Sequence, residues 1–306
     1  MAEDIVGRMR SHNSVMRGEN SGGFTLIELL VVMSIISMLT GILLPAMGKA
    51  KRSARMLVGI SNQRQAVNAL LCYEFDNDGL FPESVATIGT GQNWHWQEPT
   101  MLTAYRKRDP QTNRSMSAYL SSYIADVDIL FSPDAPEKYK YLEQLWEAGD
   151  AWDNPDTMAS EDPAMGTYCF YWSYKGYLPE DGTVFRGPRN SCGGRMQSEL
   201  LASDYFGYDH WRSPKAYGGS VPFNDSQVTS GTPISSAFWS RAGAVDGGDL
   251  GTIEIKLRAA YVDGHVETYS ASEVVPMKVP ITADGTEPYP DGVGAGDFYL
   301  PAKALH

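Results

Sequence analysis

The chain has 306 residues and carries 37 acidic against 25 basic side chains, a formal net charge of −12. This acidic balance disfavours nucleic acid as a partner, because a phosphate backbone selects basic surfaces. The length is enough for one sizeable buried core, and three cysteines are too few for a disulfide scaffold.

The first predicted element is an apolar helix that follows a polar segment over residues 1–23. Residues 29–47 carry no charged side chain, and at about 1.5 Å per residue they cover nearly the roughly 30 Å of a bilayer core. Glu28 stands at the start of this run. A carboxylate at the centre of a membrane helix costs roughly 2.5 to 3.5 kcal/mol, so we expect Glu28 to have a function. A signal peptide cleaved near Ala46 stays an alternative, although its apolar region is usually shorter.

An amphipathic segment continues this helix beyond the apolar run. Apolar side chains at three- and four-residue steps predict one helix over residues 24–75. Pro45 should kink it, because proline removes one hydrogen bond and clashes with the preceding turn. Residues 76–79 read Asp-Asn-Asp-Gly and predict the helix end, with Gly79 as a left-handed cap. The apolar repeat consists of Leu57, Ile60, Val67, Leu71 and Phe75.

The rest of the sequence predicts short strands, short helices and long loops. Alternating apolar residues over 253–261, then Asp263-Gly264 and a second run, predict a β-hairpin with an Asp-Gly turn. We therefore expect an α+β fold, in which a long kinked helix packs on a small antiparallel β-sheet with long decorating loops. Further strands are predicted at 167–178 and 200–206, short helices at 117–131 and 138–148, and loops at 88–116 and 280–296.

The segment at the start of the apolar helix carries a recognisable motif. Residues 23–28 read Gly-Phe-Thr-Leu-Ile-Glu and precede a helix that contains Pro45. This arrangement resembles the N-terminus of type IV prepilins and type II secretion pseudopilins. The resemblance implies that prepilin peptidase cleaves after Gly23 and methylates the new amine of Phe24. It also implies that Glu28 and Pro45 serve in assembly. Glu28 lies about 6 Å along the helix from the amine of Phe24, so its carboxylate would pair with that amine or with the same amine of a neighbouring subunit.

The resemblance also implies how the chain is divided. Residues 1–23 would be a leader peptide, 24–47 the transmembrane and assembly half of the helix, 48–79 its amphipathic half, and 80–306 an extracytoplasmic globular domain. The positive-inside rule slightly disfavours this orientation, because four basic residues closely follow the membrane-spanning segment whereas three precede it. We nevertheless expect the N-terminus to be cytoplasmic, on the strength of the processing motif.

Location and partners follow from the same resemblance. A protein of this kind crosses the bacterial inner membrane once, with its C-terminal domain in the periplasm, before it enters a pilus, a pseudopilus or the cell surface. Its partners would be the lipid bilayer before assembly, prepilin peptidase, other pilin or pseudopilin subunits, and the inner-membrane assembly platform.

Two further candidate sites each have a structural alternative. Asp76 and Asp78 could belong to a calcium loop, but a third ligand and the distal glutamate are missing from the expected spacing, which favours helix capping. His265 beside Asp263 could act as a base or a metal ligand, or simply lie on the surface of the hairpin. That hairpin, Tyr-Val-Asp-Gly-His-Val over residues 261–266, is similar to one near the end of large prepilin-like proteins. No cofactor other than calcium is predicted.

Motifs of catalysis are missing from the sequence. There is no Ser-His-Asp order, glycine-rich phosphate loop or paired-cysteine motif, so no enzyme is predicted. Cys169 and Cys192 could form a single bridge in an oxidising compartment, or the cysteines could stay as buried thiols. The predicted function is a structural filament subunit. The alternative is a membrane-anchored binding or adhesion module, a minor tip subunit in which some of the seven tryptophans and 17 tyrosines form an aromatic ligand surface.

Overall fold

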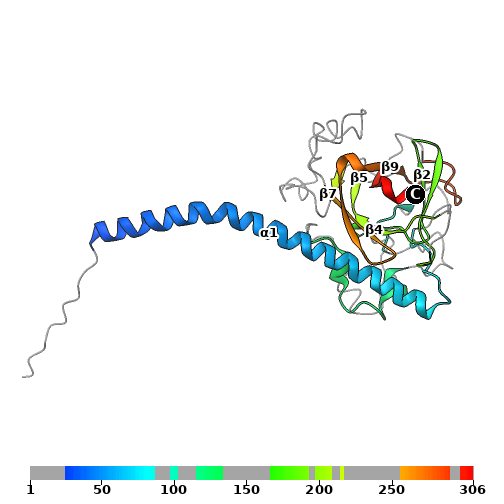
Figure 1. The fold of residues 1–306 in the computed structure, drawn as a ribbon, viewed down its shortest axis with the longest axis horizontal. Helices are drawn as coiled ribbons and strands as arrows, with labels where there is room; N and C mark the ends of the chain where they lie inside the picture. The colour runs from blue at the N-terminus through cyan, green and yellow to red at the C-terminus, as the bar shows by residue number, and fades with distance from the viewer. Residues whose placement is uncertain are drawn as a thin grey trace, which may run out of the picture. The chain divides into compact units, whose positions relative to one another are not determined.

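A computed structural model of the chain describes a long helix and a domain of two β-sheets (Figure 1). By contacts the chain divides into two compact units, Met1–Lys51 and Arg52–His306, with the boundary inside the helix. The described residues are 25–86, 97–102, 115–133, 166–192, 197–208, 214–216, 256–289 and 297–305.

Helix α1 (Leu26–Asp76) runs without a break through Pro45. It ends as its sequence predicts: the backbone N–H of Gly79 donates to the carbonyl of Glu74 (3.0 Å), and Gly79 has a φ of 73°. Asp78 also takes a left-handed conformation, with a φ of 55°. Glycine tolerates that region because it has no Cβ, whereas aspartate enters it through its short polar side chain.

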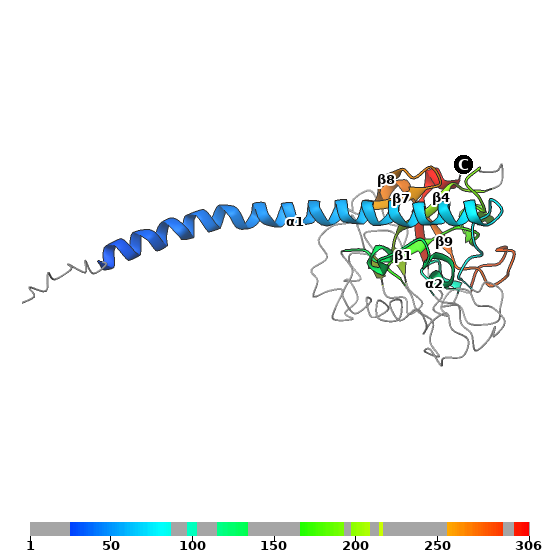
Figure 2. The same cartoon turned by 90° about the horizontal axis from the view of Figure 1, so that it is seen from below.

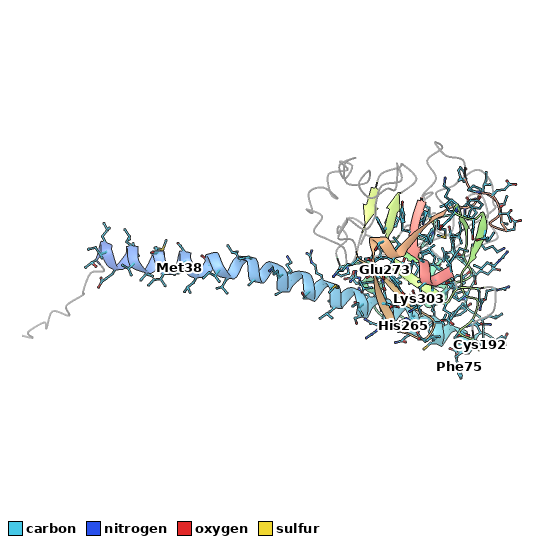
Figure 3. The ribbon with its side chains drawn as sticks, turned by 45° about the horizontal axis from the view of Figure 1, so that its top comes forward. Met38, Phe75, Cys192, His265, Glu273 and Lys303 are labelled. Atoms are coloured by element: carbon cyan, nitrogen blue, oxygen red, sulfur yellow. The ribbon has the colours of Figure 1, made fainter. Side chains whose placement is uncertain are left out.

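The buried face of the second half of α1 differs from the predicted apolar repeat. At the ends of that repeat, Leu57 is 65% exposed and Phe75 is 89% exposed, and Figure 3 shows Phe75 pointing away from the domain. Only Val67 of the repeat is fully buried. The repeat predicts the helix, which is confirmed, but it does not mark the buried face, because the domain also accepts small and polar residues of the helix. The buried residues of this part of the helix are Gly59, Gln63, Ala66, Val67, Ala69, Leu70 and Glu74.

The strands form two antiparallel sheets rather than the single small sheet that was expected. The first has the order β1-β4-β7-β8, and in Figure 2 the second half of α1 runs beside its strands β4 and β7. Its strands are β1 (Tyr168–Phe170), β4 (Leu200–Asp204), β7 (Lys256–Tyr261) and β8 (Val266–Ser270). The second has the order β3-β2-β9-β10-β5-β6. Its strands are β2 (Lys175–Leu178), β3 (Thr183–Arg186), β5 (Phe206–Tyr208), β6 (Pro214–Ala216), β9 (Val274–Lys278) and β10 (Asp297–Pro301).

The predicted hairpin and short helices are present with changed bounds. β7 and β8 pair antiparallel around the Asp263-Gly264 turn, where Gly264 has a φ of 82°, so the hairpin is confirmed. The region 117–131 holds two short helices, α2 (Met116–Leu120) and the 3-10 helix η2 (Val127–Leu130). Two more 3-10 helices flank the last strands, η5 (Ala271–Glu273) and η6 (Ala302–Leu305). The helix predicted at 138–148 lies outside the described residues.

Aromatic side chains fill the core between these elements. The segment 167–178, predicted as one strand, forms β1 and β2 with a turn between them, and Tyr171 and Trp172 of that turn are buried. Gly187 packs directly on this turn: a Cβ there would lie 1.5 Å from the carbonyl oxygen of Tyr171, so the position admits only glycine. Rings meet edge to face, as Tyr171 and Phe185 do at 5.5 Å.

Candidate assembly site

Glu28 caps the helix that carries it. Its Oε2 accepts hydrogen bonds from both the backbone N–H and the hydroxyl of Thr25 (2.8 Å each), and the hydroxyl oxygen of Thr25 accepts from the N–H of Glu28 (3.2 Å). This is a capping box, in which the first helical residues satisfy one another's donors. The spacing Thr-x-x-Glu was visible in the sequence, although its capping role was not predicted. Gly23 and Phe24 lie outside the described residues.

The apolar part of α1 is exposed along its whole length within the first unit. Every residue from 25 to 51 whose side chain is described is exposed, and the helix is long and apolar enough to cross a membrane. Two of its hydroxyls are satisfied within the helix: Ser37 donates to the carbonyl of Met33 (2.8 Å) and Thr40 to that of Ile36 (2.9 Å). Such an apolar surface is unfavourable in water and suits a bilayer or other helices.

A buried ionic cluster joins the second half of α1 to the first sheet. Arg258 lies in β7 and Asp204 in β4. The guanidinium of Arg258 donates from Nε to Oδ2 of Asp204 (2.7 Å) and from Nη2 to Oδ1 of the same carboxylate (3.0 Å). Nη1 of Arg258 donates to the carbonyl of Met56 in α1 (2.8 Å), and Nε2 of Gln63 donates to Oδ1 of Asp204 (3.0 Å). Arg258 is 0% exposed and Asp204 1%. No sequence pattern pointed to this cluster, because an arginine between the apolar positions of an alternating strand ordinarily faces solvent.

The weak calcium candidates serve the helix end in this structure. Oδ2 of Asp76 accepts from the hydroxyl of Tyr123 (2.9 Å), while Asn77 donates through Nδ2 to the carbonyl of Tyr73 (2.8 Å). Asp78 occupies the left-handed turn. Within the part of the chain that the structure describes, no group of three or more His, Cys, Asp or Glu side chains is placed to hold a metal ion.

His265 and Asp263 are bonded to each other at the tip of the hairpin. Oδ1 of Asp263 accepts from the N–H of His265 (3.0 Å) and contacts Nδ1 of its ring, and the backbone bond is the main cause that lowers the pKa of Asp263. The ring stacks on Tyr261 at 4.5 Å between centroids. Nearby, Lys303 of η6 donates to Glu267 (2.7 Å) and lowers the pKa of that carboxyl. These contacts tie the hairpin to the C-terminal segment and describe a structural role.

The three cysteines are free, and the Cys169–Cys192 bridge is absent from the structure. Cys169 is buried in β1, where desolvation raises the pKa of its thiol, whereas Cys72 and Cys192 are exposed. Strand β1 places Cys169 inside the core, whereas Cys192 lies in an exposed turn (Figure 3).

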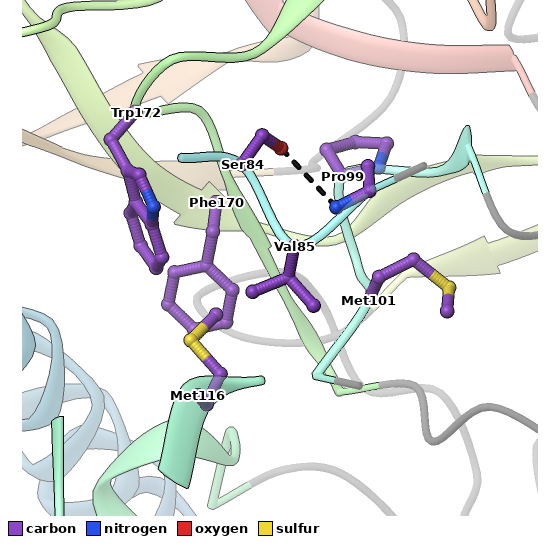
Figure 4. Close-up of a pocket in the computed structure, with 8 residues that line it drawn as sticks. Ser84, Val85, Pro99, Met101, Met116, Phe170 and Trp172 are labelled. Carbon is purple, nitrogen blue, oxygen red and sulfur yellow. Dashed lines mark hydrogen bonds between the residues drawn. The ribbon is translucent and has the colours of Figure 1, made fainter. Parts of the chain in front are cut away.

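A small crevice lies within the domain (Figure 4). It is too narrow to hold a water molecule. Hydrophobic side chains dominate its lining, which comprises Ser84, Val85, Ala86, Pro99, Met101, Met116, Phe170 and Trp172. It offers no ligand site of useful size.

Comparisons with known proteins bear on the N-terminal segment. Residues 20–44 match the family model described as the prokaryotic N-terminal methylation motif. Over 72 residues the chain is 36% identical to the type IV wide pilus major component PilA4 of Thermus thermophilus, which covers 24% of this chain and 55% of that protein. The chain thus spans about half the length of this curated relative. No solved structure matches it.

Proposed function

We propose, from the premise that the N-terminal segment is of the prepilin and pseudopilin type, that this chain is a structural subunit of a type IV pilus-like filament or a type II secretion pseudopilus. Prepilin peptidase removes residues 1–23 and methylates Phe24. The observation that carries the proposal is the coincidence of the methylation motif with the apolar first half of α1, in which every described side chain from residue 25 to 51 is exposed. The role is assembly, without catalysis and without a cofactor.

The capping box explains how Glu28 would serve assembly. Cleavage after Gly23 creates a positive amine on Phe24, one residue from Thr25, whose N–H and hydroxyl already hold the carboxylate. The positive end of the helix dipole favours a negative charge at the same place. The carboxylate is therefore kept at the N-terminal tip of the helix, where its own amine or that of a neighbouring subunit can reach it. Buried polar pairs of this kind set register between packed helices.

Location and partners complete the proposal. The apolar half of α1 holds the chain in the inner membrane before assembly and packs against other subunits afterwards, while the domain lies in the periplasm and then on the filament surface. Contacts with prepilin peptidase and with an inner-membrane assembly platform belong to the same proposal. Its support is the exposed apolar surface of the first half of α1.

Two measurements test the proposal. The intact mass of the chain purified from its own membranes should match a product that starts at N-methyl-Phe24; a retained leader, or a start near Gly48, would contradict it. Glu28→Gln should leave cleavage and membrane insertion intact but reduce filament yield, because the amide cannot neutralise an amine. Glu180→Gln is the matched control: it makes the same chemical change at an exposed loop position and should leave the yield unchanged.

A further inference from the structure

The packing of α1 on the first sheet does not by itself select one axial position. Hydrophobic contact is non-directional, and the helix offers buried apolar residues about one turn apart, as at Ala66 and Leu70. A displacement of the helix by one turn, about 5.4 Å, would present a similar apolar surface. Something directional must therefore decide where along the sheet the helix stops.

The ionic cluster of Arg258, Asp204, Gln63 and Met56 supplies that direction. Asp204 accepts both Nε and Nη2 of Arg258, which orients the planar guanidinium and leaves Nη1 aimed at one helix carbonyl, that of Met56. Gln63 reaches the same carboxylate from the next turns of the helix (3.0 Å). If the helix slid by one turn, Arg258 would lose the carbonyl of Met56 and Asp204 would lose the amide of Gln63. Polar groups would then be buried without these hydrogen bonds, which is strongly disfavoured.

Gly59 makes the fit of the guanidinium specific to one position of the helix. A Cβ at residue 59 would lie 2.0 Å from Nη1 and 2.5 Å from Cζ of Arg258, so the guanidinium lies directly on the backbone of α1. The other glycines of this helix, Gly41 and Gly48, have nothing within 4 Å of such a Cβ. The guanidinium can therefore pack against α1 only where Gly59 is opposite it.

We infer that Gly59, Met56 and Gln63 of α1, closed around the Arg258–Asp204 pair, form a clamp that fixes the axial register of the helix on the first sheet. Other polar contacts of this part of α1 reach loops and short helices, as Asn62 does at the carbonyl of Phe131 (3.2 Å). Loops can follow a moving helix. Strands β4 and β7, paired in the middle of a sheet, cannot.

The position of the clamp gives it a mechanical role, which rests on the proposed function. Gly59 is the first buried residue along the described part of α1. In a filament held together by the apolar half of the helix, tension passes into the domain at this point, and the clamp resists sliding of the helix along the sheet.

Distances between spin labels in the full chain, purified in detergent, test the clamp directly. Labels are attached at Arg64→Cys on α1 and Lys256→Cys on β7, both exposed, in a Cys72→Ser/Cys192→Ser background. The unaltered clamp should give one narrow distance. Gly59→Ala should broaden the distribution or shift it by up to about one turn, roughly 5 Å.

A second variant and a matched control keep the test decisive. Asp204→Leu/Arg258→Met removes both charges together, so that no unpaired charge is buried, and it should broaden the distance in the same way. Gly48→Ala makes the same chemical change as Gly59→Ala where nothing is crowded, and it should leave the distance unchanged. A narrow, unshifted distance in both clamp variants would overturn the inference. Because no filament is involved, an absent N-methyl group would refute the proposed function and leave the clamp untouched.

Discussion

Removing the guanidinium of Arg258 should strongly destabilise the domain. Arg258→Met keeps an unbranched apolar stem but deletes the bonds to Asp204 (2.7 and 3.0 Å) and to the carbonyl of Met56 (2.8 Å). Asp204, 1% exposed, keeps only part of its partners, among them Gln63 and the N–H of residue 258. Breaking a buried pair from one side typically costs about 3 to 5 kcal/mol, and we expect a loss in that range.

Urea unfolding of the full chain in detergent, followed by tryptophan fluorescence, measures this loss, since Trp172 is buried in the domain. With a denaturant slope of about 2 kcal/mol per molar, a cost of about 4 kcal/mol lowers the midpoint by roughly 2 M. Lys303→Met is the control, because it breaks the exposed pair with Glu267 and should cost less than about 1 kcal/mol. Equal midpoints for the two variants would refute the reasoning that burial gives the Arg258 pair its weight.

Three further outcomes are expected. A maleimide probe should label the exposed thiols of Cys72 and Cys192 in the native chain at once, but Cys169 only after unfolding. Burial raises the pKa of the Cys169 thiol, so the reactive thiolate does not form in the folded domain. Labelling of all three cysteines at equal rates would contradict the burial of Cys169. Gly187→Ala should cost at least about 2 kcal/mol in urea unfolding, since its Cβ meets a backbone oxygen, whereas Gly48→Ala should not destabilise the domain. Hydrogen bonds from Thr282 and Thr286 lower the pKa of Asp284 to about 2. Its contribution to stability should be complete above its ordinary pKa of 3.8 and disappear as pH falls through about 2, and a carboxyl titration by NMR that gave an ordinary value would contradict it.

Local patterns predicted the elements whose causes are themselves local. An apolar run of sufficient length predicted α1, and Gly79 predicted its end, because each depends on hydrogen bonds within a few residues. The Asp263-Gly264 pair predicted the hairpin for the same reason. The motif over residues 23–28 indicated the prepilin-type segment, and the match of residues 20–44 to the methylation motif confirms it.

Long-range contacts decided what these patterns could not. The face that α1 buries includes Gly59 and Gln63, which contact Arg258 and Asp204 from far along the chain. An arginine within an alternating strand predicts exposure, because burial of a single charge is costly. Burial becomes acceptable only once a carboxylate from another strand lies beside it, and no spacing along the sequence shows that.

The sequence by itself determined that the chain carries a prepilin-type segment, continues from it as one long helix, and contains a hairpin with an Asp-Gly turn. The tertiary structure alone decided that the strands form two sheets, that Cys169 and Cys192 lie apart, and that a glycine and a glutamine of α1 meet a buried ion pair. The physical reason is range. Periodicity, caps and turns depend on neighbours along the chain, whereas burial of a charge and the register of a helix depend on the partner that folding brings beside it.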